Sequence, residues 1–161
     1  MARFTASIDV GAPVEQVWAR VTDWPAHGRW IPLTTVRVTS SRPDGVGASF
    51  VARSAIGPLG FDDPMEVVVW TPPVDRAPGY VRVRKQGRVV LGWAGFEVTA
   101  LLDRPGGGSG SRVRWTEDVQ VAPVLVTRPF DRLIEVGGRF GFDRALKAMA
   151  AELEGEVRSV G

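Results

Sequence analysis

The chain has no cysteine among its 161 residues, and it has one histidine, His27, and one tyrosine. The lack of cysteine excludes disulfide bonds, thiolate catalysis and zinc or iron–sulfur sites built on cysteine. No carboxylates stand at ligand spacing beside the one histidine, so we expect no metal site and no cofactor. The fold must therefore be stabilised by side-chain packing alone.

Long apolar runs and a strong excess of charge are also missing. No window approaches the length of a membrane span, and the first ten residues lack the apolar run of a signal peptide. We therefore expect a cytoplasmic protein without integral membrane contact. The 20 basic residues nearly balance the 18 acidic ones, for a formal charge of +2, which gives little support to nucleic-acid binding.

The domain organisation is simple. A chain of 161 residues is long enough for one domain with a real core and short for two, and we find no internal repeat or linker. We expect a single domain over residues 1–161, present as a monomer or weak homodimer.

Hydrophobic periodicity predicts an α+β fold. Residues 2–10 alternate as a half-buried strand, and Val14, Val17, Trp18 and Val21 repeat at helical spacing, with a second helical turn between Trp24 and Pro32. Six hairpin-linked strands then follow, at residues 35–39, 48–56, 61–70, 79–86, 88–103 and 112–122. A long helix over residues 129–153 closes the chain and must cover a curved seven-stranded antiparallel sheet.

The last helix carries glycines where a core helix would carry large side chains. Gly137 and Gly141 are one turn apart, and we place them on the same face as Phe130 and Ile134. Glycine inside a helix costs about 0.5–1 kcal/mol relative to alanine, so some demand for space or for a bend should offset it. We expect this face to form the ceiling of a cavity above the sheet, with close helix–sheet packing as the alternative.

The order of motifs resembles a known family. The segment Ala12-Pro-Val-Glu-Gln-Val-Trp18, with Thr22-Asp-Trp-Pro25 and Trp30-Ile-Pro32, is similar to the opening of the START/Bet v 1-like (SRPBCC) superfamily, in particular its bacterial polyketide cyclase/dehydrase branch. Gly45-Val-Gly47, Trp70-Thr-Pro-Pro73, Gly95-Phe-Glu-Val98 and Arg114-Trp-Thr-Glu117 follow in the family's order. The resemblance implies a helix-grip fold, but that family spans carriers, cyclases and receptors, so it does not fix an activity.

Glu117 is the first candidate for chemistry. By alternation it shares a strand face with Trp115 and Val119, which should be the face toward the helix. Burial would raise its pKa and suit it to general acid–base catalysis or to binding a ligand hydroxyl. The plainer interpretation is a carboxylate near the cavity mouth, or one paired with an arginine such as Arg53 or Arg132.

His27 is the second, weaker candidate. It stands between Trp24 and Trp30, near the expected mouth of the cavity, where it has either a structural role or one at the entrance.

Two functions remain open from the sequence. The first is binding of a hydrophobic or aromatic small molecule, polyketide-like or an acyl-lipid, between the sheet and the last helix. The second is a polyketide cyclase/aromatase or dehydratase that transfers protons in the same cavity. The residues expected to line it are Trp30, Phe50, Phe96, Trp115, Phe130, Ile134, Gly137 and Gly141. A protein-interaction domain, which would expose an apolar patch without a cavity, is the third alternative.

Overall fold

The computed structural model describes residues 2–75, 77–101, 109–122 and 131–160, and it describes the side chains of the last helix from residue 139 to residue 159. The elements follow the predicted order. Strand β1 (Ala2–Val10) leads into helix α1 (Val14–Val21), the 3-10 turn η1 (Trp24–Ala26) and helix α2 (His27–Trp30). The remaining elements are β2 (Thr34–Val38), β3 (Ser49–Ile56), β4 (Leu59–Thr71), β5 (Gly79–Gln86), β6 (Val90–Leu101), β7 (Gly110–Val121) and α4 (Asp131–Val160).

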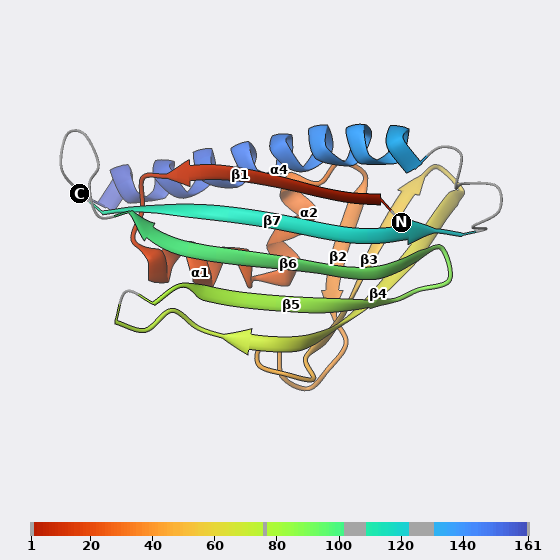
Figure 1. Cartoon of the computed structure of the whole chain (residues 1–161), viewed down its shortest axis with the longest axis horizontal. Coiled ribbons are helices and arrows are strands. Elements are labelled where there is room, and N and C mark those ends of the chain that lie inside the picture. Colours follow the sequence, from red (N-terminus) through yellow and green to blue (C-terminus); the bar gives the residue numbers. More distant parts are fainter. Residues whose placement is uncertain (1, 76, 102–108, 123–130, 161) are drawn as a thin grey trace.

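The seven strands form one antiparallel sheet in the order β1-β7-β6-β5-β4-β3-β2. The chain enters the sheet at one edge with β1, and the helical segment between β1 and β2 carries it to the opposite edge. Figure 1 shows α1, α2 and α4 on the same side of the curved sheet, with α4 lying along β1. This arrangement confirms the predicted α+β helix-grip fold.

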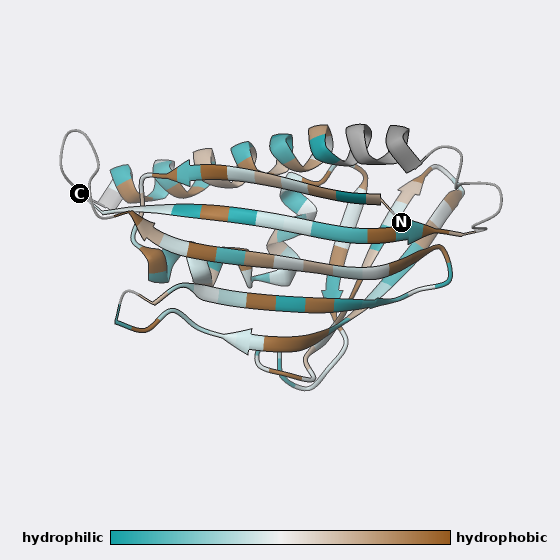
Figure 2. Cartoon of the chain, viewed as in Figure 1, coloured by the Kyte–Doolittle hydropathy of each residue, from teal (hydrophilic) through white to brown (hydrophobic). Residues whose placement is uncertain are grey.

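Alternation along the strands separates the two faces of the sheet. In β5, Val81 and Val83 are buried while Arg82 and Arg84 lie on the outer face, and Figure 2 shows this alternation as bands of hydrophobic and hydrophilic residues. Gly79 at the start of β5 has a packing role. A Cβ atom at this position would lie 2.6 Å from Cε3 of Trp18, so the glycine allows α1 to pack directly on the sheet.

Helix α4 extends further than the sequence predicted, to Val160 instead of residue 153. The C-terminal part of the helix, from residue 152 onward, is held to the rest of the fold by charge. Arg20 of α1 forms ion pairs with Glu152 and Glu156, and Glu154 accepts a hydrogen bond of 2.7 Å from the backbone N–H of Gly11. Among the described side chains of α4, the buried ones are Ala145, Leu146, Met149, Ala150 and Leu153.

The predicted position of Gly141 on the sheet-facing side of α4 is wrong. Gly141 is exposed, and a Cβ atom added to it would have no heavy atom within 4 Å. One residue further on, Phe142 turns inward and stacks on Phe4 of β1, with the ring centroids 5.2 Å apart. Phe130 lies outside the described residues, and for Ile134 and Gly137 the structure describes only the backbone of α4.

Candidate functional site

The inner face of the sheet encloses a cavity of about 210 Å³. Its floor is made by inward-facing residues of β2 to β7 and its roof by the η1–α2 segment, and Phe142 of α4 also lines it. The sequence predicts that the face of the last helix carrying Gly137 and Gly141 forms the ceiling of the cavity. Among the described side chains of α4, which begin at residue 139, only Phe142 lines the cavity, and the η1–α2 segment contributes Trp24 and His27. The full lining is Trp24, His27, Ile31, Thr34, Val36, Phe50, Ala52, Ser54, Phe61, Asp63, Met65, Val83, Lys85, Val90, Ala94, Phe96, Trp115, Glu117 and Phe142.

Aromatic rings make up much of the cavity wall. Trp24 stacks on Phe50 with ring centroids 4.4 Å apart, which ties the η1 turn to β3. Trp115 lies between Phe96, at 4.6 Å, and Phe142, at 3.9 Å. These contacts join β6, β7 and α4 around the cavity and give it flat apolar surfaces that suit a ring-shaped ligand.

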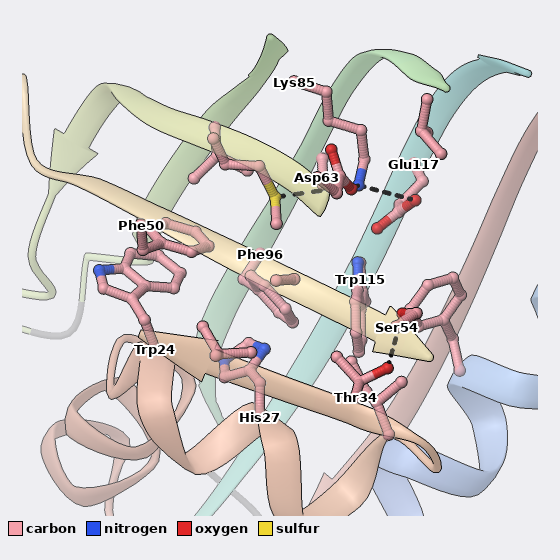
Figure 3. A pocket seen from close by; sticks show the side chains of 18 of the residues that line it. Trp24, His27, Thr34, Phe50, Ser54, Asp63, Lys85, Phe96, Trp115 and Glu117 are labelled. Atoms are coloured by element: carbon pink, nitrogen blue, oxygen red, sulfur yellow. Dashed lines mark hydrogen bonds and ion pairs between the residues drawn. The ribbon is translucent and has the colours of Figure 1, made fainter. Parts of the chain in front are cut away.

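Three charged side chains lie together on one wall (Figure 3). Lys85 of β5 donates a hydrogen bond of 2.7 Å from Nζ to Oδ2 of Asp63 in β4, and the same Nζ lies 3.8 Å from Oε2 of Glu117 in β7. All three residues are buried. Lys, Asp and Glu are almost never buried unless paired, and here two carboxyl groups face one ammonium group. We call Asp63, Lys85 and Glu117 the charged cluster.

Burial and neighbouring charges shift two pKa values in this cluster. Burial raises the pKa of Glu117, and the charge of Asp63 raises it further, while Lys85 and the indole N–H of Trp115 oppose the rise. The pKa of Lys85 is also raised: burial alone would lower it, but Glu117 and Asp63 together outweigh that effect. Lys85 therefore stays an ammonium ion, and the carboxyl group of Glu117 takes up a proton more readily than that of an exposed glutamate.

Two polar atoms of the site have no hydrogen-bond partner within the described part of the chain. They are Oδ1 of Asp63 and Nε1 of Trp115, and both are buried. The indole of Trp115 acts on the pKa of Glu117 without forming a hydrogen bond of normal geometry to it. Buried polar groups are usually paired, so the unpaired groups mark the charged wall as the part of the cavity where a ligand can contribute most.

His27 lies across the cavity from the charged cluster, with Phe96 and Trp115 between them in Figure 3. Its Nε2 donates to the backbone carbonyl of Val21 at 2.9 Å, which leaves Nδ1 as the unprotonated nitrogen. Burial among aromatic rings lowers the pKa of His27 to about 4, although the bond to Val21 and the charge of Asp23 act in the opposite direction. At neutral pH the ring is uncharged.

A pair of hydroxyl groups supplies further polarity. Thr34 of β2 and Ser54 of β3 face each other across the strand pair, with their oxygens 2.8 Å apart, and both line the cavity. Thr34 also donates to the carbonyl of Pro32 at 3.2 Å. The described residues contain no group of three His, Asp or Glu side chains placed to hold a metal ion.

The structure brings five of the predicted site residues together: His27, Phe50, Phe96, Trp115 and Glu117 all line the cavity. Trp30 does not belong to this lining. Its indole N–H donates to Oε2 of Glu152 at 2.8 Å, so Trp30 fastens α2 to α4. Gly141 is exposed and is also absent from the lining.

Sequence reasoning missed Asp63 and Lys85. Arg53, one of the partners that the sequence suggests for Glu117, points away from the cavity and pairs with Asp62 at 2.9 Å. The partner of Glu117 is Lys85. The signal for both missed residues was alternation: Phe61, Asp63 and Met65 form one set in β4, and Val83 and Lys85 form one set in β5.

Comparisons with known proteins agree on the fold. No curated protein sequence matches this chain. The structure of TTHA0849 from Thermus thermophilus is similar with a TM-score of 0.70 at 14% identity, covering 94% of this chain and 96% of that one. The ZhuI aromatase/cyclase from Streptomyces sp. R1128 is similar with a TM-score of 0.64 at 18% identity, covering 99% and 97%. Norcoclaurine synthase from Thalictrum flavum, in complex with dopamine and hydroxybenzaldehyde, gives a TM-score of 0.53 at 14% identity, covering 93% and 86%.

These structural likenesses establish the fold and leave the activity open. None of the helices in the described residues has the length and apolar character needed to cross a membrane. Residues 1–154 match the family described as polyketide cyclase / dehydrase and lipid transport, in agreement with the resemblance in the sequence motifs. The chain belongs to this polyketide cyclase/dehydrase and lipid transport family.

Proposed function

We propose that this protein binds a hydrophobic or aromatic small molecule in the cavity between its sheet and its helices. The observation that carries the proposal is a cavity of about 210 Å³ with aromatic walls and a few polar groups gathered on one side. Ligand sites are typically apolar cavities in which a small number of polar groups fix orientation. Membership of a family that includes lipid transport supports the same function.

The size of the cavity favours a compact ligand. Sites for drug-sized molecules usually enclose about 300–1,000 Å³, and an engineered cavity of about 150 Å³ in another protein holds benzene. A volume of about 210 Å³ lies between these values. Of the two ligand classes suggested by the sequence, a polyketide-like molecule with one or two rings therefore suits the cavity better than a long acyl chain.

Filling the cavity tests this proposal. Ala94 of β6 is buried and lines the cavity, so the side chain of Ala94→Leu should enter the empty space. We expect native mass spectrometry of the protein purified from its own host to reveal a retained small molecule, and the variant to lose it with little change in Tm. Ala151→Leu, on the exposed face of α4, is the matched control and should keep the ligand.

The opposite result would show that no usable cavity exists. If Ala94→Leu overpacks a closed core, it should cost about 1–3 kcal/mol and lower Tm markedly. A large fall in Tm, with no ligand retained by the wild-type protein, contradicts the binding function.

A second candidate function, a polyketide cyclase/aromatase or dehydratase, is favoured by the charged cluster. Glu117 has a raised pKa and so can serve as general acid, and the free Nδ1 of His27 lies on the opposite wall as a possible base. Glu117 suits the role of general acid better than His27 suits that of general base, because a pKa of about 4 makes His27 a weak base. Similarity of the fold to the ZhuI aromatase/cyclase is compatible with this function.

Proton transfer can be measured without knowing the natural substrate. We expect an enzyme of this kind to accelerate hydrogen–deuterium exchange at the methyl group of 2-acetylnaphthalene, followed by NMR, and His27→Phe to abolish the acceleration. Exchange no faster than in buffer, from a protein that binds the ketone, identifies a carrier instead of a catalyst.

We propose further that the protein acts in the cytoplasm as a monomer or weak homodimer without a nucleic-acid partner. The arginines of the outer sheet face support this view because they are engaged: Arg84 with Glu66, Arg112 with Asp9, and Arg82 over the ring of Trp93. Light scattering after size-exclusion chromatography, with and without duplex DNA, checks both expectations.

A further inference from the structure

The charges of the charged cluster limit the chemical class of ligand that the cavity can bind. Asp63 and Glu117 would contribute two negative charges if both were ionised, and Lys85 contributes one positive charge. The two carboxyl groups lie at different distances from the ammonium group. Nζ of Lys85 is 2.7 Å from Oδ2 of Asp63 and 3.8 Å from Oε2 of Glu117. A second buried negative charge would then be left without full compensation, which is costly. The neutral arrangement is an Asp63–Lys85 ion pair beside a protonated Glu117.

A protonated Glu117 is a hydrogen-bond donor that needs an acceptor. Its two neighbours cannot supply one, because the ammonium group of Lys85 and the indole N–H of Trp115 are themselves donors. Asp63 is held on the far side of Lys85, as Figure 3 shows. Glu117 is buried and lines the cavity, so a molecule inside the cavity can supply the acceptor.

Two aromatic rings line the same cavity as Glu117. Trp115 and Phe96, on the same floor of the cavity, have ring centroids 4.6 Å apart and can contact the face or edge of a ligand ring. A ligand oxygen near Glu117 would therefore be attached to, or close to, a ring system packed on these two residues.

We infer that the ligand of this cavity is a neutral aromatic ketone, whose carbonyl oxygen accepts a hydrogen bond from Glu117 while its ring packs on Phe96 and Trp115. The inference rests on the proposed binding function and narrows it to one ligand class. It also disfavours a free fatty acid or any other carboxylate, since a third carboxylate would have to share the one ammonium group of Lys85.

Three naphthalene probes with the same ring test the inference on the wild-type protein by isothermal titration calorimetry at pH 7. They are 2-acetylnaphthalene, which carries a carbonyl acceptor, 2-ethylnaphthalene, which has no oxygen, and 2-naphthoate, which is an anion. One satisfied buried hydrogen bond corresponds to roughly a tenfold difference in affinity. We expect 2-acetylnaphthalene to bind about tenfold more tightly than 2-ethylnaphthalene, and 2-naphthoate to bind more weakly than the ketone.

Variants at Glu117 test whether the preference for the ketone comes from a hydrogen-bond donor at this position. Glu117→Gln keeps a neutral N–H donor and should retain the preference for the ketone, whereas Glu117→Leu should bind the ketone and 2-ethylnaphthalene equally. Glu97→Leu, on the outer face of the neighbouring strand, is the matched control and should change none of the three affinities. In infrared difference spectra, the carbonyl stretch of the bound ketone should shift to lower frequency in the wild type and in Glu117→Gln, but not in Glu117→Leu.

The outcomes distinguish this inference from the proposed function. Equal affinity of the wild type for the ketone and 2-ethylnaphthalene overturns the inference and leaves the binding function standing. Tightest binding of 2-naphthoate also overturns it, and would assign Lys85 as an anchor for anions. If the folded wild-type protein binds none of the three probes, the proposed binding function fails together with the inference.

Discussion

Protonation of His27 should couple the stability of this protein to pH. The folded protein buries the neutral ring against Trp30, Phe96 and Trp115, and this burial lowers the pKa to about 4. In the unfolded chain the ordinary value of about 6.5 applies. Between pH 6.5 and pH 4 the unfolded chain therefore binds a proton that the folded protein does not, so stability falls as the pH falls through this window.

The size of the effect follows from the difference between the two pKa values. A difference of about 2.5 pKa units corresponds to a change of about 3 kcal/mol in the free energy of unfolding across the whole window. This is a large share of the stability of an ordinary domain. The ring of His27 is buried, so solvent screening reduces this figure little. Above pH 6.5 the contribution of His27 does not change, and below pH 4 it becomes constant again.

His27→Gln isolates this contribution. Glutamine can keep an N–H donor toward the carbonyl of Val21 but does not titrate. We expect urea unfolding at a series of pH values to show that the stability of the wild type relative to the variant falls by about 3 kcal/mol between pH 7 and pH 4. Acidic groups titrate in both proteins and cancel in this difference. Because His27 is the only histidine, its NMR titration needs no assignment. A pH-independent difference, or a ring pKa near 6.5 in the folded protein, refutes the reasoning.

Three further predictions concern stability. Lys85→Met should destabilise the protein by about 3–5 kcal/mol in chemical denaturation, because it leaves the buried carboxylate of Asp63 without its cation, while Arg53→Met at an exposed pair should cost less than about 1 kcal/mol. Glu152→Gln should cost about 1–2 kcal/mol at pH 7. The hydrogen bond from Arg29 lowers the pKa of Glu152, so this difference should shrink as the pH falls below about 4.5, and a cost that grows in acid would contradict the assignment. Gly141→Ala should raise stability by about 0.5–1 kcal/mol, seen as a higher Tm, since the position is helical and open; a lower Tm would mean that the site is enclosed.

Period-2 alternation made part of the site predictable. In β7, alternation predicts that Trp115 and Glu117 lie on the inner face because every second residue of a strand points the same way, and the structure puts both in the cavity wall. The same rule applied to β5 would have continued the inward series from Val81 and Val83 to Lys85. The chemistry of lysine argued against burial, and only the tertiary structure, which brings Asp63 and Glu117 beside it, compensates its charge.

The rotation of α4 about its own axis is harder to predict from the sequence. A helix face is identified by its large apolar side chains, and glycine has none, so the rotation of α4 around Gly141 was ambiguous. The structure fixes that rotation through Phe142, which packs against Phe4 and Trp115 and turns Gly141 toward solvent. The roof of the cavity was unpredictable for another reason: it depends on how η1 and α2 fold back over the sheet, and these are contacts between segments distant in sequence.

The pairing of β1 with β7 also affects how the protein folds. Every other neighbouring pair of strands is consecutive in sequence and can form as a local hairpin, but Ala2 pairs with Val119 and Val10 with Ser111. During synthesis, β1 emerges first and has no partner strand until almost the whole meander has been made. Because α4 packs on β1 and follows β7 in sequence, docking of the last helix joins the same distant parts of the chain as this strand pair. Closure of the β1–β7 pair, with its large loop entropy, should therefore be the slow step in folding, and the cavity is complete only after it.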